Sequence, residues 1–247
     1  MSLRSFQDVE RYRRALEETR QTDYVAQEVN NLARRLELYW NNYAIPLGRI
    51  EGMAKSYMRT GEFRIIAKYA RELEENLRRF IELREKYSEA SHELMREIVY
   101  DDGYGLQFIA VVTGVKLGRI QDIARKNKSA TSTIDLLNEI LKIYDAIYID
   151  HALLLGDISA SVSIINRHLG EADLDPVWDE ARIDPMVKRL VDLGASIAVT
   201  FTKIVIGTVS DLSYAVEHDW IEPEDQEYYE DILAIVEHFG KTLPARK

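Results

Sequence analysis

Residues 131–168 read TSTIDLLNEILKIYDAIYIDHALLLGDISASVSIINRH, and this stretch decides the fold class. Its apolar side chains recur at alternating steps of three and four residues, which places them on one face of an α-helix. The mean step of 3.5 residues is the period at which neighbouring helices pack in a left-handed bundle. The stripe consists of Ile134, Leu137, Leu141, Tyr144, Tyr148, His151, Leu155, Ile158, Val162 and Ile165.

Three other segments carry the same pattern, at about residues 23–58, 63–99 and 185–218. A helix of about 35 residues is about 50 Å long, and helices of matched length pack well against one another. No segment alternates between apolar and polar residues as a half-buried strand does. We therefore predict an all-α fold, an elongated antiparallel bundle of these four long helices. Shorter flanking helices are expected at about 4–20, 106–127 and 223–240.

Two prolines modify the predicted helices. Pro46 lies inside the first long helix, and because it removes a backbone donor we expect a kink there. The pair Asp184-Pro185 combines a capping residue with a proline suited to the first helical position. The fourth long helix is therefore predicted to begin at this pair.

The composition is that of a folded protein without thiol chemistry. The 247 residues contain no cysteine, which excludes disulfides, thiol nucleophiles and cysteinyl metal sites. Residues 1–20 lack the apolar core of a signal peptide, and Lys203 and Asp211 interrupt the most apolar long stretch, 193–216. We expect one all-α domain over 1–247 in a cytoplasmic protein. The lack of cysteine and the many Arg, Glu, Ile and Tyr residues are typical of a thermophilic source.

Acidic charge is concentrated in the last third of the chain. Residues 169–247 contain 7 basic and 17 acidic residues, so they carry the whole net charge of −10. This divides the predicted domain into a near-neutral part, 1–168, and an acidic part, 169–247. Such a surface repels phosphate and attracts basic proteins, although a merely solubilising surface is the commoner case. Two runs supply most of the charge, at 171–184 and 217–231.

A metal site is one alternative. Glu89 and His92 are three residues apart on one helix face, as in carboxylate-bridged di-iron bundles, and Glu28 is predicted at a similar level on the preceding helix. The resemblance to ferritin-like bundles is limited, because those proteins repeat the Glu-x-x-His pair and this chain does not. The alternative reading is a metal-binding bundle that holds iron or another divalent metal at these residues. Otherwise no cofactor is predicted.

Nucleic-acid binding is a second alternative. The spacing of apolar residues over 116–137 resembles a helix-turn-helix segment. It includes the strongest basic patch of the chain, which consists of Lys116, Arg119, Arg125, Lys126 and Lys128. The turn lacks the usual glycine, the second helix is too long for a recognition helix, and the protein is acidic elsewhere. Basic residues at the end of a helix also complement its dipole without any ligand.

Two polar residues fall on otherwise apolar helix faces. His151 interrupts the stripe of residues 131–168, and Asp211 lies near the seam of the fourth long helix. Buried polar groups are usually hydrogen-bonded, so His151 is predicted to be a paired core histidine, with Tyr144 and Tyr148 on the same stripe. A register device or a buried site is the other interpretation.

No catalytic constellation emerges from the sequence. The phosphate-binding loop and the Gly-x-Ser-x-Gly elbow are absent, and the pair His218-Asp219 lacks the partners of a metal-dependent hydrolase. The leading hypothesis is a non-enzymatic interaction or scaffold protein. It would act through self-association or through a basic protein partner.

Overall fold

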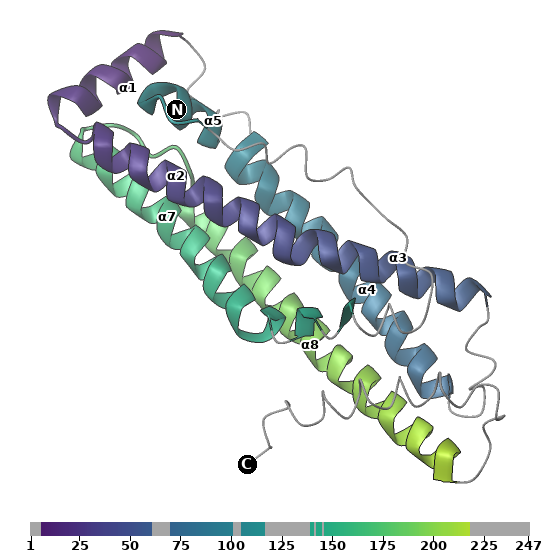
Figure 1. Cartoon of the computed structure of the whole chain (residues 1–247). Coiled ribbons are helices and arrows are strands. Elements are labelled where there is room, and N and C mark those ends of the chain that lie inside the picture. Colours follow the sequence, from purple (N-terminus) through teal and green to yellow (C-terminus); the bar gives the residue numbers. More distant parts are fainter. Residues whose placement is uncertain are drawn as a thin grey trace. The chain divides into compact units, whose positions relative to one another are not determined.

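The computed structural model of the protein describes residues 6–60, 70–100, 105–116, 139–140, 142–144 and 146–217. Within these ranges every regular element is a helix, and none of the described residues forms a strand. The α-helices are α1 (Phe6–Glu18), α2 (Thr22–Tyr39), α3 (Ile45–Thr60), α4 (Ala70–Met95), α5 (Gly105–Thr113), α7 (His151–Glu171) and α8 (Glu180–Glu217). Short π-helical turns extend three of the helical runs, namely η1 (Trp40–Ala44), η3 (Arg96–Tyr100) and η5 (Ala146–Asp150). The predicted all-α helical bundle is therefore confirmed (Figure 1).

The long helices lie close to their predicted bounds. The run α2–η1–α3 covers 22–60, against a prediction of 23–58, and α4 with η3 ends at residue 100. The third long helix ends at Glu171, and α8 ends at Glu217. The predicted starts at 63 and 131, and the flanking helix at 223–240, lie outside the described residues.

The predicted start of the fourth long helix is wrong. Helix α8 begins at Glu180, five residues before Pro185, which lies inside the helix. Asp179 caps this earlier start, because its Oδ1 accepts a hydrogen bond from the backbone N–H of Ala181 at 3.1 Å. Ile183, in the added turn, is fully buried. The cap and this burial favour the longer helix, although the proline removes one backbone donor.

The interruption before Pro46 is a π-helical turn. Residues Trp40–Ala44 adopt it immediately ahead of the proline. Such turns occur where the regular hydrogen-bond ladder is disturbed. A second difference concerns the flanking helix predicted at 106–127, because α5 ends at Thr113. Gly114 follows with φ of 74°, a left-handed conformation that terminates a helix.

The chain divides into two compact units, each built from three separate segments. Unit 1 contains Met1–Ile45, Lys86–Lys126 and Ile149–Gly194, and unit 2 contains Pro46–Glu85, Asn127–Tyr148 and Ala195–Lys247. The expected division of charge at residues 168 and 169 falls inside unit 1. None of the helices in the described part of the chain is long and apolar enough to cross a membrane.

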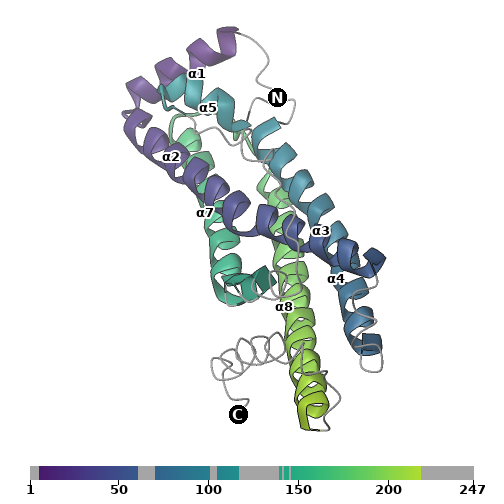
Figure 2. The ribbon, with the colours of Figure 1, turned by 45° about the vertical axis from the view of Figure 1, so that its right-hand side comes forward.

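Antiparallel helix pairs form the core of unit 1. Helix α2 packs along α7 and also against α5, which in turn contacts α1 (Figures 1 and 2). The direction of α2 against α7 follows from two contacts, Glu28 with Ser161 and Tyr39 with His151, in which one residue number rises while the other falls. The same reversal relates α7 to α8, because Ser159 contacts Asp184 and Ser163 contacts Glu180. Apolar side chains at helical spacing close this core.

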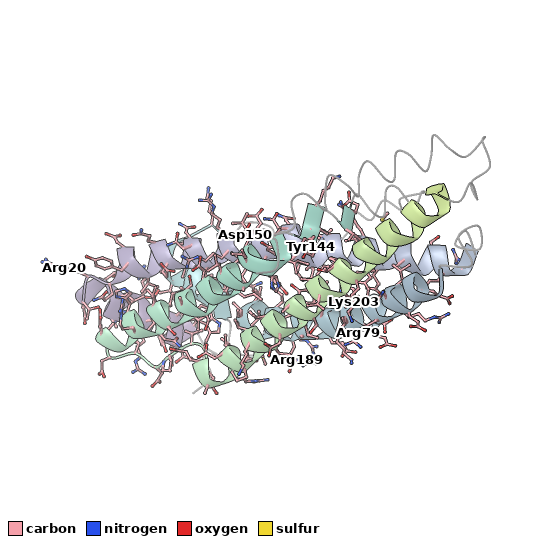
Figure 3. The ribbon with its side chains drawn as sticks, turned by 90° about the horizontal axis from the view of Figure 1, so that it is seen from below. Arg20, Arg79, Tyr144, Asp150, Arg189 and Lys203 are labelled. Atoms are coloured by element: carbon pink, nitrogen blue, oxygen red, sulfur yellow. The ribbon has the colours of Figure 1, made fainter. Side chains whose placement is uncertain are left out.

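Unit 2 is held by contacts of the same kind. Phe80 of α4 packs on Phe201 of α8, with ring centroids 5.1 Å apart. Thr202 donates a hydrogen bond to the Tyr144 hydroxyl at 2.9 Å. Figure 3 labels Tyr144 and, on α8, the exposed Lys203.

Candidate functional site

The backbone of the segment between α7 and α8 is hydrogen-bonded to α7 through one side chain. Asn166, on the inner face of α7, donates a hydrogen bond from Nδ2 to the backbone carbonyl of Trp178 at 2.8 Å. Its Oδ1 accepts hydrogen bonds from the backbone N–H groups of Val177, at 3.2 Å, and Trp178. A single amide thus satisfies both the donors and the acceptor of an irregular stretch of backbone.

Two buried apolar side chains of the same segment, Leu174 and Trp178, also fix it in place. The Trp178 indole donates a hydrogen bond to the carbonyl of Ile98 at 3.2 Å. The Tyr12 hydroxyl of α1 donates a hydrogen bond to the backbone carbonyl of Asp175 at 2.8 Å. Burial, and next the negative charge of Asp175, raise the pKa of Tyr12 to about 12, so this hydroxyl remains a donor. The segment is therefore anchored to three different helical regions.

Carboxylates cover the outer side of residues 171–184, here called the acidic segment. Several of them accept hydrogen bonds from neutral groups. Ser159 donates to Asp184, Ser163 and Asn166 both donate to Glu180, and the backbone of Ala181 donates to Asp179. Neutral donors orient a carboxylate without cancelling its charge.

Among the residues that the structure describes, few positive charges pair with the acidic segment. Its one arginine, Arg182, pairs with Glu97 of η3 at 3.2 Å, so that cation already has an acidic neighbour outside the segment. His168 lies 3.1 Å from Glu171 and balances it only when protonated. Asp173 and Asp175 are exposed, and Asp173 adopts a φ of 54°, which Asp tolerates better than most residues. The acidic segment is consequently rigid and negatively charged at once.

A second polar site surrounds His151. Only 1% of His151 is exposed, so the imidazole is buried. Its Nε2 lies 2.6 Å from the Tyr87 hydroxyl of α4, and the Tyr43 ring of η1 meets the imidazole edge-on, with centroids 4.9 Å apart. A neighbouring hydrogen bond of 2.8 Å links the hydroxyls of Tyr39 and Ser91. Tyr39, Tyr43, Tyr87, Ser91 and His151 together form the tyrosine–histidine cluster.

The backbone is shaped to admit the imidazole. A Cβ atom placed on Gly194 of α8 would lie 2.7 Å from Cε1 and 2.8 Å from Nδ1 of His151, far inside van der Waals contact. Two π-helical turns flank the ring, because η5 ends directly before His151 and η1 contains Tyr43. Burial lowers the pKa of His151 to about 4, so the imidazole is neutral near pH 7. We assign the cluster to helix register, because the imidazole is buried and its Nε2 is hydrogen-bonded to the Tyr87 hydroxyl.

The three candidate metal ligands do not form one site. Glu28 accepts hydrogen bonds from Ser161 and Arg35, and its second oxygen accepts one from Asn31 at 3.0 Å. Burial alone would raise the pKa of Glu28, but these hydrogen bonds and the Arg35 charge lower it overall. Glu89 is exposed, and the His92 ring packs on Trp40. No group of three or more His, Asp and Glu residues suited to a metal ion occurs in the part of the chain that the structure describes.

The basic patch lies mostly outside the described residues. Lys116 is exposed beyond the end of α5, whereas Arg119, Arg125, Lys126 and Lys128 are not among the residues that the structure describes. Asp211 belongs to α8, but its side chain is likewise not described. Most of the acidic run at 217–231 also lies outside the described residues.

Asn166 and Gly194 escaped the sequence analysis. Asn166 directly follows Ile165, which belongs to the predicted apolar stripe. A polar residue beside such a stripe indicates a side chain with a buried hydrogen-bond partner. Gly194 interrupts an apolar helix without an obvious turn, which indicates close approach of another group. Comparison with known proteins adds no further assignment, because no family model, curated protein or solved structure matches this chain.

Proposed function

We propose that this chain is a non-enzymatic interaction protein that binds a basic protein partner through the acidic segment. The observation that carries the proposal is the combination of rigidity and uncompensated charge at residues 171–184. A surface held in place before binding loses less conformational entropy when a partner docks. Charges that are oriented by neutral donors stay available to attract lysine and arginine.

The proposal is tested by binding a lysine- and arginine-rich peptide to the full chain. Asp173→Asn combined with Asp175→Asn removes two exposed carboxylates, and Asn accepts the left-handed backbone at residue 173. We expect the dissociation constant to rise about tenfold, since each lost charge contact at a preorganised surface is worth up to about 1 kcal/mol. Fluorescence anisotropy at several salt concentrations measures the change.

A matched variant separates this surface from net charge. Glu75→Gln combined with Glu89→Gln also removes two carboxylates, from exposed positions on α4. We expect this variant to bind like the wild type. Equal weakening by both variants, or no binding by the wild type at low salt, would show that the acidic segment is not a binding surface.

A further inference from the structure

We infer that the outer face shared by α2 and α7 is a self-association surface that binds a second copy of this chain. Three of the seven large hydrophobic residues that are exposed among the described residues lie there. Leu153 is 64% exposed, Ile149 60% and Leu38 40%. Exposed apolar groups that gather on one face mark an interaction site, whereas scattered ones do not. The inference is independent of the acidic segment.

Leu38 and Leu153 lie at one level of unit 1, and Ile149 precedes Leu153 by four residues, in η5. Arg35 contacts Asp157, with Nε and Oδ2 3.9 Å apart, and Tyr39 contacts His151 with ring centroids 6.0 Å apart. Leu38 lies between Arg35 and Tyr39 along α2, and Leu153 lies between His151 and Asp157 along α7. The two leucines therefore flank the same stretch of the α2–α7 junction. Figures 1 and 2 both draw these helices side by side.

The same face of α7 continues with small residues. Gly156 and Ala160 follow Leu153 at helical spacing and are exposed, and no atom lies within 4 Å of a Cβ built on Gly156. Small residues beside larger apolar ones allow another helix to approach closely. This extends the apolar face along about two turns of α7.

Charge complementarity identifies the partner as a second copy. The α2 side of the face carries the exposed Arg34, and the other side carries Asp157 of α7 and Asp150 at the end of η5. Figure 3 labels Asp150. A two-fold axis along the α2–α7 junction places α2 of one copy over α7 of the other. Arg34 then faces Asp157 of the second copy, and the apolar residues meet at the centre. A surface that is basic on one side and acidic on the other matches itself in this way.

The first experiment measures the mass of the full chain in solution by sedimentation equilibrium at micromolar concentration. We expect the wild type to have twice the chain mass of 28.6 kDa. Leu153→Asp is expected to give the monomer mass, because it places a charge at the centre of the apolar contact. Val111→Asp changes an equally exposed valine on α5 and should leave the dimer intact. Far-UV circular dichroism checks that both variants are folded.

Charge reversal supplies the second test. Arg34→Glu or Asp157→Arg alone is expected to raise the dimer dissociation constant roughly tenfold, because each change affects two symmetry-related pairs. The double variant should recover most of the loss. A monomeric wild type, a dimeric Leu153→Asp variant, or dissociation by Val111→Asp would overturn the inference.

Discussion

His151 shows how one polar residue restricts the arrangement of an apolar core. The imidazole accepts or donates a hydrogen bond only where the Tyr87 hydroxyl meets it, and it fits only where Gly194 leaves room. A shift of α4 or α8 by one turn would bury the ring without a partner, at a cost of about 1–3 kcal/mol. The tyrosine–histidine cluster therefore favours one register over its neighbours.

A methyl group at residue 194 tests this fit. We expect Gly194→Ala to lower the free energy of unfolding by about 1–3 kcal/mol, because the new Cβ would overlap the buried imidazole. Gly52→Ala is the matched change on an exposed surface of α3, away from the proposed self-association face, where we expect a gain of about 0.5–1 kcal/mol in the free energy of unfolding. Urea unfolding monitored by circular dichroism gives both values. Equal effects at the two glycines would mean that contact with His151 is unimportant.

The pKa of His151 predicts an acid-sensitive contribution to stability. In the folded chain its pKa is lowered to about 4 by burial, whereas the unfolded value is about 6.5. Between these values the unfolded state binds more protons, so stability present above pH 6.5 is lost as the pH falls toward 4. We expect the free energy of unfolding to fall by about 3 kcal/mol between pH 7 and pH 4 from this residue alone.

The measurement compares the wild type with His151→Gln, whose amide retains a polar group opposite Tyr87. The difference in free energy of unfolding between them should change by that amount from pH 7 to pH 4. Carboxylates such as Glu28 titrate in both proteins and cancel in the difference. A constant difference across this range would show that His151 is not desolvated in the folded state.

At the scale of elements, α7 performs different tasks on its successive faces. His151 and Asn166 point inward to α4 and to the acidic segment, Ser161 meets α2, and Leu153 is exposed. Since helical side chains three or four residues apart share a face, one regular helix can separate these tasks without any loop. The acidic segment depends on α7 most directly.

Asn166→Ala should loosen the acidic segment. Removing the amide breaks its hydrogen bonds to the backbone N–H groups of Val177 and Trp178 and to the carbonyl of Trp178. We therefore expect the free energy of unfolding to fall by about 1–3 kcal/mol. Hydrogen exchange of residues 173–181 should become faster. Ser163→Ala removes only a side-chain bond to Glu180 and should leave these exchange rates close to those of the wild type. Unchanged exchange in Asn166→Ala would show that Leu174 and Trp178 suffice to hold the segment.

Helix positions were largely predictable, whereas their partners were not. The 3.5-residue period placed Leu155, Ile158 and Val162 on the buried face of α7, and all three are buried. Periodicity reports which face is covered but not what covers it, so the meeting of His151 with Gly194 could not be read from either segment. The start of α8 differs from the prediction at Asp184-Pro185 because Asp179 caps the helix ahead of Glu180.

At the scale of the whole molecule, the concentration of acidic residues in the last third was visible from counting alone, but their rigidity was not. The residues that hold the acidic segment in place, Tyr12, Ile98 and Asn166, lie far apart in the chain. Only the fold brings them together. The proposed binding surface thus takes its charge from residues that are close in sequence, whereas the residues that hold it in place are far apart in sequence.

The contact between Gly194 and His151 also constrains how this protein diverges. A side chain larger than hydrogen at residue 194 fits without strain only when residue 151 has lost its ring, because both groups would occupy one volume. Relatives of this chain should therefore exchange the two positions together, with alanine or serine on α8 accompanied by a smaller aliphatic residue on α7.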